Sequence, residues 1–400
     1  MAAAPGPRRL VAGVEGGGTT WVCALAPLDD PAKILERATF DTTGEPAATL
    51  SAVAAWLEAR RGRFGAVGIA TFGPVDPRRG SPTFGFITET PKPGWRNTDV
   101  VGRLAGSLDA DVVVAFDTDV NAPAVAEYRA TIRDDAEGST AVTSLAYVTV
   151  GTGVGVGLCV NGAPVHGFLH PEGGHVAAPL HAGDAAYDAS GLTALACDGW
   201  HEIEAMVATR ALARRAGCDA KDLALLPDDH PVWDAAAHYL ASLVATLVLV
   251  VSPQRVVLSG GVMQRASLFP EIRRKVVAYL NGYIPNLDAA ACEEVVVPSK
   301  WRNDAGIVGA LTLARDALLE REALENTPAV SSSSTTWCRR LLGTLTSRRT
   351  SATTTTTPTR TSSELPAGDV ATLVLVASGY ALLAGIVIGR YWTLARTRVR

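Results

Sequence analysis

The chain has 400 residues, 48% of them hydrophobic and 19% charged, which is enough length for two or three domains and enough apolar sequence for a sizeable core. Lysine and arginine total 36 against 40 aspartate and glutamate residues, and this near-balance argues against a dedicated nucleic-acid-binding protein. The six cysteines show no paired spacing, which argues against a secreted disulfide scaffold and favours a reducing compartment.

The first predicted element is a strand at residues 10–14, followed directly by Glu-Gly-Gly-Gly-Thr-Thr and a second apolar stretch at 21–26. The glycines are therefore expected in a β-hairpin turn, which excludes the dinucleotide-binding fingerprint and the P-loop because both need a helix next. Glycines let backbone amides approach a phosphate and threonine hydroxyls add donors; a plain hairpin is the alternative. The candidate phosphate-binding residues of this turn are Gly16, Gly17, Gly18, Thr19 and Thr20.

Carboxylates follow the predicted strand at residues 111–116. The sequence Asp-Thr-Asp-Val-Asn occupies 117–121, at the carboxyl end of the strand, where the sites of α/β proteins open. A carboxylate in this place can act as a general base, and capping of the next helix is the alternative role.

A second strand–turn–strand unit begins at residue 144 and contains Gly-Thr-Gly-Val-Gly-Val-Gly at 151–157. Its candidate phosphate-binding residues are Thr149, Gly151, Thr152 and Gly153. A further predicted strand ends in Gly260 and Gly261, where the missing side chains would let a flat adenosine lie against the backbone.

The composition changes after residue 326. Residues 327–369 are rich in serine and threonine and predict a disordered tether. Residues 370–389 carry no charge and are long enough, at about 1.5 Å per residue, to cross a bilayer as a single transmembrane helix. The basic tail at 390–400 is typical of a membrane interface. The apolar run at 239–251 is shorter and predicts a buried helix instead.

Together these patterns resemble the ROK sugar kinases (repressor, open reading frame, kinase), in particular their fructokinase-like branch. The resemblance covers residues 10 to about 318 and is specific because its blocks occur in the family's order. The blocks are EGGGTT at 15–20, GIATFGPVD at 68–76, TPKPGW at 90–95, DTDVNA at 117–122, YVTVGTGVGVG at 147–157, HPEGGH at 170–175, SPQRVVLSGGVM at 252–263 and NDAGIVGA at 303–310.

The resemblance implies an α/β fold of two lobes, actin-like and ribonuclease H-like, with the active site in an interlobe cleft. The first lobe is expected at residues 8–123, completed by a helix at 303–323, and the second lobe at 124–302. A C-terminal single transmembrane helix would follow.

The implied activity is that of an ATP- and Mg²⁺-dependent hexose kinase, in the first place a fructokinase that makes fructose 6-phosphate from D-fructose. A kinase for glucose, mannose or an N-acyl hexosamine is an alternative, and a catalytically inactive sugar-binding protein is another. The family's repressors carry a helix-turn-helix ahead of the kinase-like region, and about nine residues before the first strand leave no room for one. The expected partners are a sugar and ATP, with no nucleic acid, and a homodimer as in relatives.

The family's motifs imply residue roles. Asp119 matches the catalytic base. The residues that match sugar-binding positions are Asn121, Glu172, His175, Glu204, Gly73 and Pro74. The turn at 90–95 resembles a loop that lines the sugar site, with Trp95 against the C–H face of the sugar.

The family's structural zinc motif, Cys-x-x-His-x-x-Cys, is altered in this chain. Cys197 and His201 remain at a longer spacing, and Glu202 stands where the second cysteine would be. Zinc accepts carboxylate oxygen, so His175, Cys197, His201 and Glu202 form one candidate site. Loss of zinc, with the loop held by packing, is the alternative.

The location is expected to be a membrane, with the catalytic region facing the cytosol. The N-terminus has no signal peptide pattern, and the single hydrophobic span comes at the end of the chain, as in tail-anchored proteins.

Overall fold

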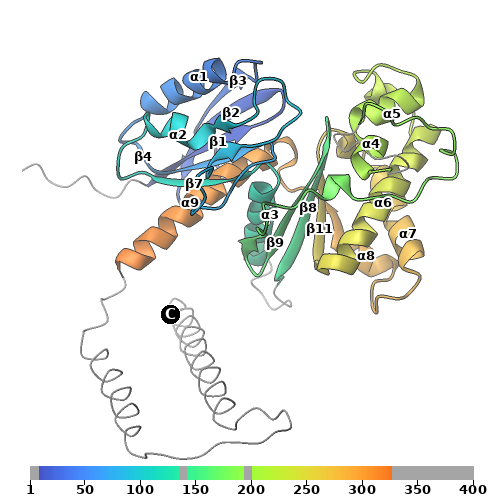
Figure 1. Ribbon diagram of the computed structural model, residues 1–400. Coiled ribbons are helices and arrows are strands. Elements are labelled where there is room, and N and C mark those ends of the chain that lie inside the picture. The colour runs from blue at the N-terminus through green and yellow to red at the C-terminus, as the bar shows by residue number, and fades with distance from the viewer. Residues whose placement is uncertain (1–8, 135–141, 193–200, 327–400) are drawn as a thin grey trace, which may run out of the picture. The chain divides into compact units, whose positions relative to one another are not determined.

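The computed structural model describes residues 9–134, 142–192 and 201–326. The predicted tether at 327–369, the predicted transmembrane helix at 370–389 and the basic tail at 390–400 lie outside the described residues, as does Cys197. The described residues form two five-stranded sheets, each covered by helices, in the two-lobed α/β arrangement (Figure 1).

The first sheet belongs to the N-terminal lobe. Across the sheet its strands are β3 (Glu36–Asp41), β2 (Thr20–Pro27), β1 (Leu10–Gly16), β4 (Phe64–Thr71) and β7 (Val113–Thr118). β1 and β2 form the predicted antiparallel hairpin, and β4 and β7 run parallel to β1. A small separate ribbon pairs β5 (Phe86–Ile87) with β6 (Thr98–Asp99).

Both faces of the first sheet are buried, because alternate residues of each strand point to opposite sides. Ala12 and Val14 of β1 pack in one cluster with residues of α1 (Pro46–Glu58) and α2 (Val100–Ala105). Val11 packs on the other face with α9 (Ala305–Glu325). This helix comes from the C-terminal part of the described chain and returns to the first lobe (Figure 1).

The second sheet has the same connection pattern. Across the sheet its strands are β10 (Ala163–Pro164), β9 (Val154–Val160), β8 (Ser144–Val150), β11 (Arg255–Ser259) and β12 (Val296–Pro298). β8 and β9 form the second predicted hairpin, and β11 and β12 run parallel to β8.

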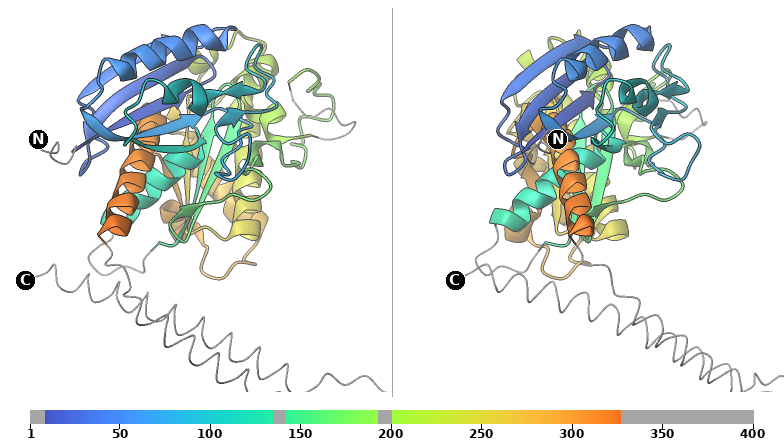
Figure 2. Two further views of the ribbon diagram at one scale, coloured as in Figure 1. Left: turned by 60° about the vertical axis from the view of Figure 1, so that its left-hand side comes forward. Right: turned by 90° about the vertical axis from the view of Figure 1, so that its left-hand side faces the viewer.

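Helices also cover both faces of the second sheet. α3 (Asn121–Asp134) packs on one face, in a cluster with Leu145 and Tyr147 of β8. Ala146 and Val148 face the opposite cluster. The helices on that side of the lobe are α4 (Ile203–Val207), α5 (Thr209–Ala216), α6 (Pro231–Val251), α7 (Leu268–Leu280) and α8 (Ala289–Val295). α3 and α9 pack against each other and lie between the two sheets (Figure 2).

α6 contains the apolar run at 239–251, which the sequence analysis predicts to be a buried helix. Within the described residues it is the one helix with the length and hydropathy of a membrane span. Its side chains instead fill the core of the second lobe, where Tyr239, Leu240 and Val244 are fully buried. The prediction of a buried helix is confirmed.

Candidate active site

The carboxyl ends of three parallel strands lie side by side at one edge of the first sheet. Gly16 of β1 is in register with Thr71 of β4, and Thr71 is in register with Thr118 of β7. Asp119 follows Thr118 immediately, and its backbone N–H donates to the carbonyl of Thr71 at 3.0 Å. The predicted base is therefore fixed to the neighbouring strand and emerges beside the first glycine turn.

Asp119 lies in surroundings that disfavour its charge. Burial, and secondly the negative charge of Glu172, raise the pKa of Asp119 to about 7. A carboxylate with a pKa near neutrality is matched to accepting a proton at physiological pH. This is the environment expected of a general base, and it brings Glu172 of the second lobe into the electrostatic surroundings of Asp119.

Glu15 is a second enclosed carboxylate that the sequence analysis does not single out. Burial raises its pKa to about 7, and Asp119 adds to the shift. Space for its side chain exists because residue 306 is glycine: a Cβ there would lie 2.0 Å from Glu15 Oε1. The backbone of Ile307, in the first turn of α9, partly offsets this rise in the pKa of Glu15. The glutamate that precedes the glycine turn is the sequence signal that could have identified it.

The first phosphate-binding turn is held by its own backbone and by Thr42. Gly17 N donates to Thr20 O at 2.9 Å, and Thr42 Oγ1 donates to Gly17 O at 2.8 Å. Gly16 also has a packing role, since a Cβ there would come within 2.6 Å of Thr71 Oγ1. Gly18 has open space where a Cβ would stand, so a phosphate could approach its backbone.

The second turn is built in the same way. Gly151 N donates to Gly153 O at 2.9 Å, and both the backbone N–H and the hydroxyl of Thr209 donate to Gly151 O at 2.8 Å. A Cβ on Gly153 would meet Glu204 Oε2 at 2.6 Å, whereas Gly151 faces open space. Thr42 and Thr209 hold the two turns, and sequence reasoning missed both because each lies far along the chain from the turn it bonds to.

The predicted adenosine-facing glycines have different surroundings. Gly260 adopts a φ of +92°, and a Cβ there would lie 2.4 Å from Val150 O. It therefore supports the strand that leads into the second turn. Gly261 has open space around its Cα, as the adenosine role requires.

Two predicted sugar-site residues lie beside a histidine from the other lobe. The peptide between Gly73 and Pro74 is cis, and Val75 N donates to His170 Nε2 at 3.0 Å. A Cβ on Gly73 would come within 3.1 Å of the His170 ring, so glycine permits this contact. His170 thus joins the loop after β4 to the second lobe.

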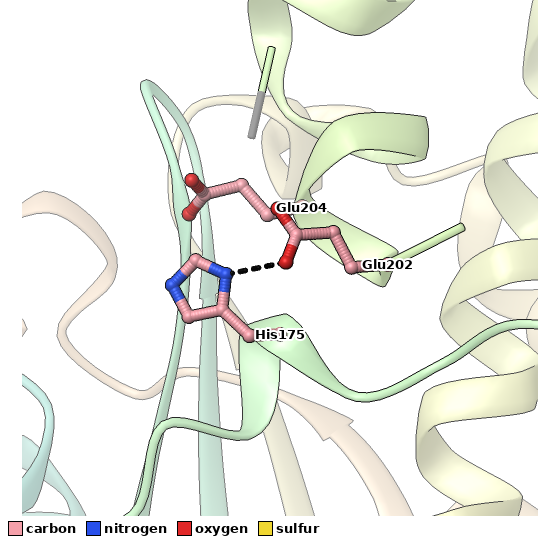
Figure 3. Close-up of side chains that lie close together, drawn as sticks. All are labelled: His175, Glu202 and Glu204. Carbon is pink, nitrogen blue, oxygen red and sulfur yellow. Dashed lines mark hydrogen bonds and ion pairs between the residues drawn. The ribbon is translucent and has the colours of Figure 1, made fainter. Parts of the chain in front are cut away.

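Four other predicted residues, Glu172, His175, Glu202 and Glu204, gather in the second lobe. Glu172 Oε2 lies 3.9 Å from His175 Nε2. His175 Nδ1 lies 2.8 Å from Glu202 Oε2, and candidate ligand atoms of His175, Glu202 and Glu204 lie within 4.8 Å of one another (Figure 3). Glu204 also accepts from Val154 N at 2.8 Å, which connects this cluster to the second turn.

Asn121 has a role other than the predicted sugar contact. It is fully buried, its Nδ2 donates to Asp117 Oδ1 at 2.9 Å, and its Oδ1 accepts from Leu158 N at 3.2 Å. The side chain therefore links β7 to β9 and is not presented to a sugar. It is the first residue of α3, and the hydroxyl of Thr118 accepts from its backbone N–H.

Trp95 does not line the site. Its side chain is fully buried, its ring stacks on Trp21 at a centroid distance of 5.3 Å, and its Nε1 donates to Thr43 O. The expectation of a ring against the sugar is wrong, because this tryptophan belongs to the core of the first lobe.

The predicted zinc donors are only partly brought together. Glu202 is fully buried, and its Oε1 has no hydrogen-bond partner within the described part of the chain. That orphaned oxygen beside His175 has the chemistry of a cation ligand. His201 is not part of the cluster that the described residues form, where Glu204 is the third member.

Comparisons with known proteins agree with this geometry. The model of the ROK family matches residues 11–317. Fructokinase of Pediococcus pentosaceus is 34% identical over 313 residues, which cover 77% of this chain and 99% of that protein. Fructokinase of Streptococcus mutans is 34% identical over 309 residues, which cover 77% of this chain and 98% of that protein. Among solved structures, a ROK family glucokinase from Streptomyces griseus in complex with glucose and AMPPNP has a TM-score of 0.58 at 21% sequence identity. The match covers 77% of this chain and 99% of the glucokinase chain.

The raised pKa of Asp119 predicts a stability effect. Between pH 4 and 7 the folded protein binds more protons than the unfolded chain at Asp119 and Glu15, so the free energy of unfolding falls as the pH rises through this window. Asp119→Asn removes one charge and should raise the free energy of unfolding at pH 8 by about 2 kcal/mol, since one pKa unit is worth about 1.4 kcal/mol and enclosure is incomplete.

Thermal unfolding of the two proteins at pH 5 and pH 8 measures this effect. The gain should be clearly smaller at pH 5, because the wild-type carboxyl is protonated there in the folded protein and most of the loss builds up between pH 5 and pH 7. Asp219→Asn, at a side chain that is 74% exposed, is the control and should show no such pH dependence. A variant less stable than the wild type at pH 8 would contradict the expected enclosure of Asp119.

Proposed function

The chain belongs to the ROK family, and we propose that within it this protein is an ATP-dependent fructokinase, which transfers the γ-phosphoryl group of ATP to D-fructose and releases fructose 6-phosphate and ADP. The observation that carries the proposal is the placement of Asp119. It is an enclosed carboxylate beside the first glycine turn, and Glu172 of the predicted sugar site contributes to its raised pKa. The choice of fructose is supported by the curated fructokinases that match over nearly their whole length.

Asp119 acts as the general base in the proposed mechanism. The sugar hydroxyl is a poor nucleophile, and its proton passes to Asp119 as the bond from oxygen to the γ-phosphorus forms and the bond to the ADP oxygen breaks. The tie from Asp119 N to Thr71 O fixes the direction in which the carboxylate emerges. Glu172, His175 and Glu204 would hold the sugar hydroxyls, because carboxylates and imidazole offer acceptors and donors at short range.

Glu15 would hold the Mg²⁺ that accompanies ATP. Two partly buried carboxylates lie beside the first turn, and the charge of Asp119 adds to the raised pKa of Glu15; this is an excess of negative charge that a cation would relieve. Carboxylate oxygen is also the ligand type that Mg²⁺ prefers. When bound, the ion would neutralise charge on the phosphate oxygens.

The test is a coupled assay of the full-length protein for ADP release with fructose, glucose, mannose and N-acetylglucosamine. Fructose should give the highest kcat/KM. Asp119→Asn should lower kcat by about 10²–10⁴-fold with little change in either KM, because the amide keeps the shape but cannot accept the proton. A near-normal kcat in this variant would contradict the role of Asp119. The absence of turnover by the wild-type protein on every hexose would favour the sugar-binding alternative.

We propose that zinc is bound weakly if at all. His175 and Glu202 already bond to each other at 2.8 Å, and oxygen in place of a cysteine thiolate weakens a structural zinc site. Elemental analysis of the purified protein should find well under one zinc per chain. One tightly held zinc per chain would show that Glu202 has replaced the cysteine, and Cys197→Ala should then lower the stability of the protein.

We also propose a membrane anchor at residues 370–389, with the catalytic region on the cytosolic side, where ATP is available. The support is the sequence: twenty residues without a charge, followed by an arginine-rich tail. Gly385 and Gly389 have the spacing that lets two such helices pack, which would favour a homodimer. The full-length protein should stay in the pellet after carbonate extraction of membranes, and its release into the supernatant would end the proposal.

A further inference from the structure

Asp117, two residues before Asp119, makes a contact between the lobes that the mechanism above does not use. Its side chain is almost fully buried at the end of β7 in the first lobe. His166 lies on the loop after β10 in the second lobe, and its Nε2 is 2.9 Å from Asp117 Oδ2. A carboxylate only accepts, so His166 donates. The bond lowers the energy of the charged imidazole and raises the pKa of His166.

The other oxygen of Asp117 organises the turn that leads to Asp119. Asp117 Oδ1 accepts from Thr118 N at 2.8 Å and from Asn121 Nδ2 at 2.9 Å. Thr118 Oγ1 in turn accepts from Asn121 N at 2.9 Å. Residues 117–121 therefore form a bonded turn around the carboxylate of Asp117, with Asp119 between its two ends.

If His166 were removed, the buried Oδ2 of Asp117 would lose the hydrogen bond that His166 Nε2 donates to it. A buried carboxylate oxygen that loses its donor is left desolvated without a hydrogen bond, so it would rotate or recruit water to recover one. Either change would disturb Oδ1, which holds Thr118 and Asn121. The position of Asp119 thus depends on a histidine of the opposite lobe.

We propose that His166 is a positioning residue of the phosphoryl transfer: by donating to Asp117 across the lobes, it fixes the turn at 117–121 and with it the direction of the Asp119 carboxylate. The inference rests on the proposed role of Asp119 as the base. Catalytic groups need placement to within a fraction of an ångström, and an error of about 1 Å can cost about a hundredfold in rate.

Three variants of His166 in the full-length protein separate positioning from simple loss of structure. His166→Ala removes the donor. His166→Gln places an amide N–H near the position of Nε2, and His166→Asn places one nearer that of Nδ1, too short to reach Asp117. His181→Ala is the matched control, because its Nε2 also lies 2.9 Å from a carboxylate, Asp234, at a comparable side-chain exposure of 22% against 32% for His166.

The first measurement is steady-state kinetics with fructose and ATP. His166→Ala and His166→Asn should lower kcat by about 10–100-fold and leave both KM values within about threefold. His166→Gln should recover kcat to within about fivefold of the wild type, and His181→Ala should keep it. In an Asp117→Asn background, His166→Ala should cost less than twofold more, since the two residues act through one bond. A kcat for His166→Ala within twofold of the wild type would overturn the proposal, as would a loss of the same size in His181→Ala.

The second measurement does not depend on activity. Amide hydrogen exchange of the segment 113–121 should be about tenfold faster in His166→Ala than in the wild type, and unchanged in His166→Gln and His181→Ala. Unchanged exchange in His166→Ala would show that the turn does not depend on His166. If the wild-type protein phosphorylates no hexose, the proposed function fails, while the exchange data still decide whether His166 holds the turn.

Discussion

Two enclosed carboxylates, Asp119 and Glu15, share the edge of the first sheet, and much of the surrounding structure follows from that arrangement. Burial raises the pKa of each to about 7; the charge of Glu172 adds to the rise at Asp119, and the charge of Asp119 adds to the rise at Glu15. Two such carboxylates lower the free energy of unfolding of the ligand-free protein at neutral pH. They keep their positions because the backbone around them has little freedom to move. Glu15 lies in the strand β1, and the backbone N–H of Asp119 donates to Thr71 O of β4. In the proposed mechanism a cation near Glu15 and a hydroxyl that donates to Asp119 would offset this charge, as expected of a site in which stability is exchanged for activity.

Glycines leave the space that these carboxylates occupy. The clustering of glycines in the sequence does not show which of them have this role. Gly306 leaves the volume that the Glu15 carboxylate occupies, and Gly153 leaves room for Glu204 beside the second turn. Gly260 brings β11 against Val150. Gly18 and Gly151, by contrast, face open space, so they are the glycines at which the backbone itself is presented. The glycine-rich motifs therefore contain two kinds of position: some are filled by neighbouring protein atoms, and others leave open space beside the backbone.

The sequence was informative where a function depends on neighbours along the chain. Both hairpins, the strand before Asp119 and the buried helix at Tyr239 could be predicted from the order of apolar residues and glycines, because those features are local. The roles of Thr42, Thr209 and His166 could not be predicted in this way, because each forms a hydrogen bond to a residue 25 or more positions away along the chain. Asn121 and Trp95 were misassigned for the opposite reason. A motif gives the residue type but not which way the side chain points, and both side chains point into the protein.

The loop from His166 to His175 shows how the two lobes can act as one site. His166 bonds to Asp117 and His170 to Val75, both in the first lobe, while His175 bonds to Glu202 within the second lobe. His170 Nε2 accepts from Val75 N, whereas His166 Nε2 donates to the carboxylate of Asp117. The two contacts therefore use histidine in different ways: one ring accepts a hydrogen bond from the first lobe and the other donates one to it. Because Glu172 lies on the same loop and raises the pKa of Asp119, a displacement of this loop would change the surroundings of the carboxylate that we propose as the base. Under that proposal, one short segment would couple the sugar contacts to the acceptance of the proton.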